Sequence, residues 1–139
     1  MTTVADFAAL LPADALIADR RNEVAADAIE NAPSLRIAAA EIVREGYLLH
    51  YAQSRYYSFD DPDLGLLAGD RMYAAGLAAL SAVGDTEAVG ALASLIAGCA
   101  EAHAVGPANN SVARADDLWH STLAMLAPGS GADGSQGPA

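Results

Sequence analysis

The spacing of apolar residues is the feature that most restricts how this chain can fold. Apolar residues recur every three or four positions between proline and glycine boundaries, and no segment alternates in the way a strand does. About a quarter of the residues are alanine, the strongest helix former, whose small side chain lets helices approach closely. The pattern predicts an all-α fold.

Prolines, glycines and capping residues divide this pattern into segments. The expected helices cover residues 3–11, 12–31, 35–57, 64–83, 87–104 and 112–126. Residues 128–139 are rich in Gly, Ser and Pro and are expected to form a disordered tail. We therefore expect residues 1–127 to form a single-domain bundle of about five or six helices.

The expected helix caps are side chains that accept a hydrogen bond from the first helical turn. Ser34 is expected to cap the helix over 35–57. Either Asp85 or Thr86 is expected to cap the helix over 87–104, and either Asn110 or Ser111 the last helix.

Between residues 35 and 104, three expected helices have predicted faces. In the helix over 35–57, the apolar face is Leu35, Ala38, Ile42, Gly46 and Leu49, and Arg36, Glu41, Arg44 and Glu45 fall largely on another face. The next two helices carry apolar stripes, namely Leu66, Tyr73, Leu77 and Leu80, then Val89, Leu92, Ile96, Cys99 and His103.

Other side chains on or near these faces have mainly structural interpretations. We expect Cys99 to act as a small buried hydrophobe and His103 to be a hydrogen-bonded core or interface residue. The tyrosines, at 47, 51, 56, 57 and 73, are expected to line the rim of a core or an interface.

Composition excludes several classes of function. The formal net charge is −11, which disfavours binding to nucleic acid or to an anionic membrane surface. A single cysteine provides no disulfide framework and no cysteine-based zinc site. No apolar stretch reaches the length of a transmembrane helix, and the first residues do not resemble a signal peptide, so we expect a cytoplasmic protein.

Two acidic clusters invite a comparison of metal binding with simpler roles. Carboxylates at 60, 61 and 63 are able to hold Mg²⁺, but acids just before a helix more often cap it. Asp116, Asp117 and His120 share one side of the last helix and are weak candidates for metal ligands. An ordinary solvated face is the favoured interpretation, and no metal site is expected.

The segment containing Gly69 and Asp70 is unusual because it interrupts an otherwise strong helix. Glycine inside a helix costs about 1 kcal/mol relative to alanine, and a buried aspartate requires a partner. The favoured explanation is close helix packing at Gly69, with Asp70 paired with an arginine or a helix end. The alternative is a carboxylate directed into a cavity.

The stretch LLAGDRMYAAGLAALSAVGDTEAVGALASLIAGCAEAH, residues 66–103, resembles the central helix pair of all-α trans-polyprenyl diphosphate synthases. In that family a helix containing L-A-G-D is followed by a Gly-Asp turn and an Ala-rich helix. Weaker similarity extends back through residues 41–50. The resemblance implies possible binding residues, which are Gly69, Asp70, Arg71, Tyr73, His50 and Tyr51.

Departures from the family point away from catalysis. The residues after His50 lack the aspartate pair that would hold Mg²⁺ in a catalytic member, and Asp116-Asp117-Leu118-Trp119-His120 only partly matches DDxxD. The chain is more similar to the small non-catalytic component of two-component, heptaprenyl-type synthases. The resemblance thus implies a non-catalytic subunit with no cofactor of its own, and Mg²⁺ only in complex with a catalytic partner.

Two other interpretations remain open. The alternative is an unrelated protein-interaction module that forms a homodimer through small residues such as Gly90, Ala93 and Gly98. The least favoured interpretation is a ligand-binding or enzymatic site. It would combine Asp70 with Asp116, Asp117 and His120.

Overall fold

The computed structural model describes residues 31–54, 59 and 61–127, and every regular element in these ranges is helical. The helices are α3 (Leu35–Tyr51), α4 (Pro62–Ala82), α5 (Thr86–Ala104), the 3₁₀ turn η1 (Pro107–Asn109) and α6 (Ser111–Leu126). The all-α prediction is confirmed for this part of the chain. The helices expected over 3–11 and 12–31, and the tail over 128–139, lie outside the described residues.

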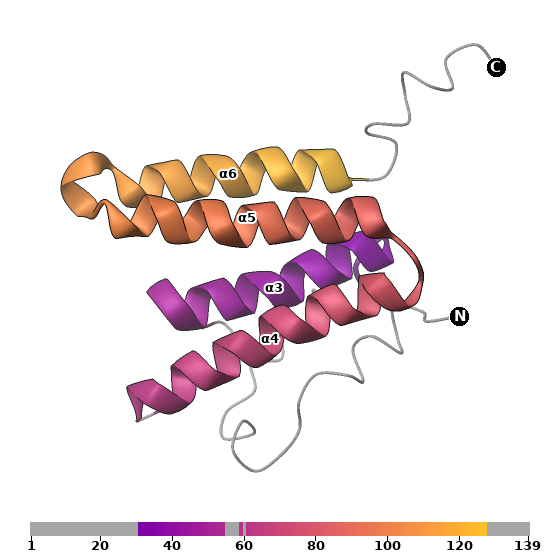
Figure 1. The fold of residues 1–139 in the computed structure, drawn as a ribbon, viewed down its shortest axis with the longest axis horizontal. Helices are drawn as coiled ribbons and strands as arrows, with labels where there is room; N and C mark the ends of the chain where they lie inside the picture. The colour runs from indigo at the N-terminus through magenta and orange to yellow at the C-terminus, as the bar shows by residue number, and fades with distance from the viewer. Residues whose placement is uncertain (1–30, 55–58, 60, 128–139) are drawn as a thin grey trace.

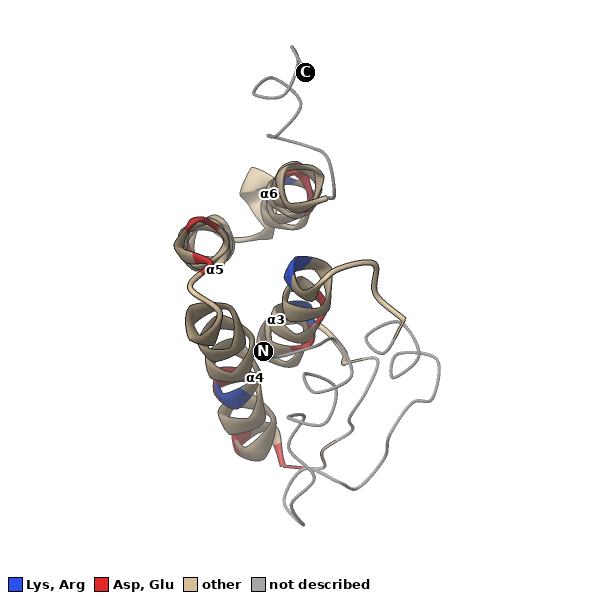
Figure 2. Cartoon of the chain, turned by 90° about the vertical axis from the view of Figure 1, so that its right-hand side faces the viewer, with Lys and Arg blue, Asp and Glu red and all other residues tan. Residues whose placement is uncertain are grey.

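The four described α-helices form two packed pairs, and each helix runs antiparallel to the next (Figure 1). Helix α3 lies beside α4, and α5 lies beside α6. Viewed along the helices, the α5–α6 pair stacks on the α3–α4 pair (Figure 2). The shared interior contains many alanines, and its largest fully buried side chains include Ile42, Met72, Leu80 and Leu92.

Helix α3 begins as predicted and ends earlier than predicted. Ser34 Oγ accepts a hydrogen bond from the Ile37 amide at 3.2 Å. The helix stops at Tyr51 instead of continuing to residue 57, because Ala52 leaves the helical conformation and the Ser54 hydroxyl donates back to Glu45 at 2.7 Å. Glu45, expected to lie largely on another face than the apolar one, is nevertheless buried.

Helix α4 has the predicted acidic cap but a different buried face. The carboxylate of Asp61 accepts from the Asp63 amide at 2.9 Å, and Pro62 occupies the first turn, so the capping interpretation is confirmed at Asp61. Leu66, predicted to be on the apolar stripe, is 42% exposed. The residues that α4 buries are mostly small: Gly65, Ala68, Gly69, Met72, Gly76, Ala79 and Leu80.

Glycines bring the backbones of α3 and α4 into direct contact. A Cβ atom at Gly46 would lie 2.7 Å from the Gly69 carbonyl oxygen, and one at Gly69 would lie 2.6 Å from the ring of His50. A Cβ at Gly76 would meet Val43 Cγ2 at 2.6 Å. These distances are shorter than any normal carbon contact, so only glycine permits this spacing. The prediction of close packing at Gly69 is confirmed.

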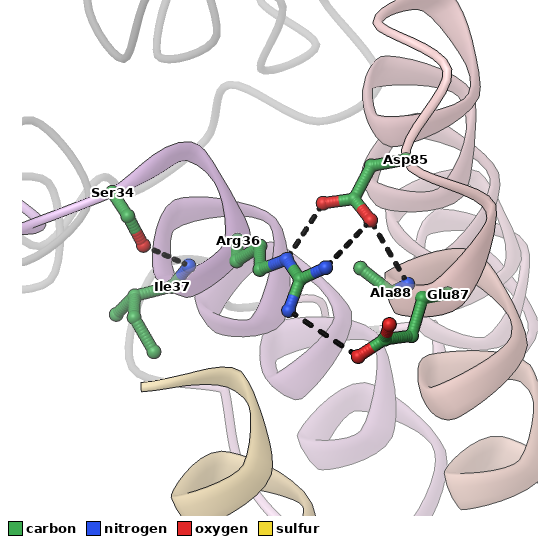
Figure 3. A network of polar contacts seen from close by, with 6 residues as sticks. All are labelled: Ser34, Arg36, Ile37, Asp85, Glu87 and Ala88. Carbon is green, nitrogen blue, oxygen red and sulfur yellow. Dashed lines mark hydrogen bonds and ion pairs between the residues drawn. The ribbon is translucent and has the colours of Figure 1, made fainter. Parts of the chain in front are cut away.

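A bidentate ion pair fixes the start of α5 against α3 (Figure 3). Gly84 takes a positive φ of 76°, and the next residue, Asp85, caps α5 by accepting from the Ala88 amide at 3.2 Å. Arg36 donates to both oxygens of the same carboxylate, at 2.7 and 2.8 Å, and approaches Glu87 at 3.8 Å. Of the two predicted caps, the structure selects Asp85.

The connection from α5 to α6 contains a short 3₁₀ turn that the sequence did not predict. Helix α5 ends at Ala104, as expected, and Gly106 follows with a positive φ of 83°. Asn110 then adopts a left-handed conformation and precedes α6, although its side chain makes no capping hydrogen bond. On α5 the predicted stripe is confirmed, with Leu92 and Cys99 buried and Val89, Ile96 and His103 half-buried. None of the described helices combines the length and apolar character needed to cross a membrane.

We expect Gly46→Ala to lower the free energy of unfolding by about 1 to 3 kcal/mol, because the new methyl group would press against the Gly69 backbone. Gly90→Ala is the matched control. Nothing lies within 4 Å of a Cβ at Gly90, so helix propensity alone should raise stability, by up to about 1 kcal/mol. Urea unfolding measures both variants, and the same sign of change in the two would contradict the packing argument.

We expect Asp85→Asn to lower the free energy of unfolding by about 1 kcal/mol at neutral pH, because asparagine keeps the cap but loses the ion pair. Hydrogen bonding to Arg36 lowers the pKa of Asp85. The contribution of ionised Asp85 to the free energy of unfolding is therefore fully present above the ordinary carboxyl pKa of about 4. It is lost as the pH falls through the lowered pKa of Asp85 in the folded protein. Urea unfolding between about pH 6 and pH 3 should show the gap between the two proteins closing; a constant gap would argue against the ion pair.

Candidate functional site

Six aromatic and histidine side chains gather where all four helices meet. They are Tyr47, His50 and Tyr51 of α3, Tyr73 of α4, His103 of α5 and Trp119 of α6, and we call them the aromatic–histidine cluster. Their ring centroids form a connected series with separations between 4.2 and 5.8 Å. The cluster joins all four described α-helices through ring contacts and two side-chain hydrogen bonds.

His50 connects α3 to α4. Its Nε2 lies 2.9 Å from Asp70 Oδ1, and because a carboxylate only accepts, the imidazole nitrogen donates. The ring stacks on Tyr73 with centroids 5.2 Å apart and planes tilted by 5°. The histidine thus fills the space that Gly69 leaves open, and both its orientation and its tautomer are fixed.

Asp70 differs from the prediction in two ways. Its side chain is 67% exposed, so the expectation of a buried carboxylate was wrong. Its partner is His50, one helix away, instead of an arginine or a helix end. The carboxylate of Asp70 points outward because position 70 follows the buried Gly69 on the helix.

His103 connects α5 to α3 through two contacts. Its Nε2 and the Tyr47 hydroxyl share a hydrogen bond of 2.8 Å. The ring also stacks on Tyr51, with centroids 4.2 Å apart and an angle of 6° between the planes. The hydrogen bond expected of His103 as a core or interface residue is confirmed, and its side chain is half-buried.

Trp119 closes the cluster from α6. Its ring meets Tyr47 edge-on, with centroids 5.6 Å apart, and the Arg44 guanidinium lies 5.7 Å from its centroid. The indole N–H is buried and meets no partner with hydrogen-bond geometry among the described residues. Burial has the larger effect on the pKa of the Cys99 thiol and raises it, whereas contact with Trp119 lowers it.

Burial sets the acid–base behaviour of the cluster. It raises the pKa of Tyr47 to about 12 and also raises the pKa of Tyr73 and of Tyr51. Burial, with the negative charge of Asp116, raises the pKa of the Cys99 thiol to about 11. These groups stay protonated at neutral pH, so the thiol is a poor nucleophile, as the sequence predicted.

A hollow of about 430 Å³ adjoins His50, between the end of α3 and the start of α4. Leu49, Phe59 and Leu66 give it apolar walls, and Gln53 adds an amide. A carboxylate that orients an imidazole is the arrangement that prepares a histidine for proton transfer. The geometry is able to hold a small apolar group beside such a histidine.

The structure brings together four of the residues singled out by sequence: His50, Gly69, Asp70 and Tyr73. Tyr51 belongs to the same cluster but stacks on His103 instead, and Arg71 is exposed on α4. Tyr47 and Trp119 were not proposed as site residues. The spacing of Tyr47 and Tyr51, four residues apart, was the available indication of a shared helix face.

The weak metal candidates on α6 occupy a solvent-facing surface. Asp116, Asp117 and His120 are all exposed. Within the described ranges, no three His, Cys, Asp or Glu side chains gather closely enough to hold a metal ion. The carboxylate at residue 60 lies outside the described residues.

We expect Tyr47→Phe to lower the free energy of unfolding by about 1 kcal/mol at neutral pH, because it leaves the half-buried His103 without its hydrogen bond. Because the pKa of Tyr47 is raised, the contribution of its protonated hydroxyl to the free energy of unfolding is fully present below about pH 10. It is lost as the pH rises through the folded-state pKa of about 12. The stability gap between the two proteins should therefore narrow above about pH 10.

An absorbance titration of tyrosine ionisation provides an independent readout. The Tyr47→Phe variant should lack one tyrosine that ionises late in the titration of the wild type. Tyr51 is 39% exposed, and Tyr51→Phe should remove a tyrosine that ionises at a lower pH than Tyr47. Identical titration curves for the two variants would refute the assignment of Tyr47 as the buried partner of His103.

No family model, no curated protein and no solved structure matches this chain. The likeness of residues 66–103 to polyprenyl diphosphate synthases therefore remains a sequence resemblance. What it implies for function is taken up below as a proposal.

Proposed function

We propose that this chain is a non-catalytic helical subunit that binds the catalytic subunit of a trans-polyprenyl diphosphate synthase. The observation that supports the proposal is the local fold of the stretch that carries the resemblance. Residues 66–103 lie within α4 and α5, two helices joined by a turn at Gly84 and Asp85. The resemblance implies the same arrangement, a Gly-Asp turn between an L-A-G-D helix and an Ala-rich helix.

The outer face of α4 is suited to contact with another protein. Leu67 is 65% exposed and Leu66 is 42% exposed, beside the exposed charges of Asp70 and Arg71. Neighbouring apolar and charged side chains of this kind are typical of interfaces, where the apolar groups supply affinity and the charges select the partner. On this proposal Mg²⁺ and diphosphate bind the catalytic partner, and this chain borders the channel for the growing isoprenoid.

Co-expression with a catalytic subunit that has intact aspartate-rich motifs tests the proposal. We expect the two chains to co-purify and the complex to be more active, or to make a different product length, than the catalytic subunit alone. Leu67→Asp should weaken the complex at least about tenfold, equivalent to about 1.4 kcal/mol. Val112→Asp, at a 61% exposed position on α6, is the matched control and should leave the complex intact.

Absence of both a complex and any change in activity would refute the proposal.

A second candidate function, a homodimeric interaction module, is favoured by the exposed small residues of α5, which include Gly90, Ala93, Ala97 and Ala100. Light scattering of the purified chain distinguishes the two, because a strict monomer at high concentration removes the homodimer.

A further inference from the structure

A long open groove runs between α5 and α6, away from the aromatic–histidine cluster. It consists of two adjoining hollows of about 420 and 380 Å³ that share Leu118 and Ser121. On α5 the lining extends from Glu87 to Ala102, which corresponds to about 22 Å of helix. The groove is long enough for about four turns of another helix.

The floor of the groove is formed by small side chains. Gly90, Ser94 and Gly98 are spaced four residues apart, so they lie on the same side of α5. A Cβ at Gly90 meets nothing within 4 Å, whereas one at Gly98 would come within 3.1 Å of Leu118 Cδ1. The backbone of a partner is therefore able to approach α5 closely near Gly90. Near Gly98 the side chain of Leu118 covers the helix.

Apolar side chains form the walls. Leu95 is buried at the base, while Leu118 is 36% exposed and Met125 is 41% exposed. An unbranched methionine adapts its shape to different apolar partners. These walls match the apolar stripe of an amphipathic helix, which inserts a side chain every three or four residues.

The charged side chains around the groove favour an occupant that carries positive charge. Glu87, Glu101 and Asp117 contribute carboxylates to the lining, and Arg114 contributes a guanidinium. The whole chain carries a net charge of −11. A second copy would set like charges opposite one another, whereas arginine or lysine beside an apolar stripe would complement these carboxylates.

We propose that the α5–α6 groove binds an amphipathic helix of a partner protein, with an apolar stripe flanked by lysine or arginine. The stripe packs on Leu95, Leu118 and the small residues of α5. The flanking cations meet Glu87 at one end, and Glu101 with Asp117 at the other. The inference does not depend on a prenyl synthase as the partner, and its test uses a different probe, so the two proposals fail separately.

The test uses the full chain and a fluorescently labelled synthetic peptide of about 16 residues, the length of helix that the groove accommodates. Leucines form one stripe of the peptide and lysines flank it. We expect fluorescence anisotropy to report saturable binding that weakens at least about tenfold when glutamates replace the lysines.

Gly90→Leu is the decisive variant, because it fills the floor of the groove and also replaces glycine with a better helix former. We expect an unchanged or higher thermal midpoint and a loss of peptide affinity of at least about tenfold. Ala93→Leu places the same side chain on an exposed position of α5 outside the groove lining and should leave the affinity unchanged.

Three results would overturn the inference. Equal affinity of the wild type and Gly90→Leu for the lysine peptide would show that the peptide binds elsewhere. Equal affinity for the lysine and glutamate peptides would remove the role of the carboxylates. A dimer seen by light scattering that Gly90→Leu dissociates would assign the groove to a second copy of the chain.

Discussion

The contact between the backbones of α3 and α4 is the constraint on which the rest of the bundle depends. Gly46 and Gly69 face each other so closely that neither tolerates a methyl group without movement of the other helix. Gly76 repeats the arrangement against Val43 two turns along α4. No bulky side chain separates the two helices at these positions. The stability of the pair here comes from many short-range contacts between small groups. Each glycine weakens its own helix, and close packing offsets that cost.

The close spacing also decides what surrounds the pair. His50 has room over Gly69, which lets it stack on Tyr73 and reach Asp70. At the opposite end of α3, Arg36 holds the cap of α5. With α5 fixed at its start, His103 near its other end comes within hydrogen-bond distance of Tyr47. The glycine contact and the ion pair thus help to position the members of the aromatic–histidine cluster on α3, α4 and α5.

The sequence predicted the features that depend on neighbouring residues. Ser34 and Asp85 were identifiable as caps because a cap acts on its own helix within three residues. Hydrophobicity alone misplaced Leu66, because the buried face of α4 consists mostly of small residues and leaves this leucine partly exposed. The buried carboxylate of Glu45 accepts a hydrogen bond from Ser54, which lies beyond the end of α3, so this partner could not be read from helix periodicity. His50 and Asp70 are twenty residues apart, so their pairing depends on how α3 and α4 align.

The residues that carry the synthase resemblance already have structural roles, and this bears on where a partner would bind. Gly69 serves the contact with α3, and Asp70 orients His50 through one oxygen while most of its carboxylate faces solvent. A substitution at either position would disturb packing as well as recognition, so loss of binding there would not identify an interface. Leu67 and Gly90 lack this ambiguity, since one side chain is largely exposed and the other position faces open space. Recognition is therefore best sought on the outer surfaces of α4 and α5, where a change in binding is separable from a change in stability.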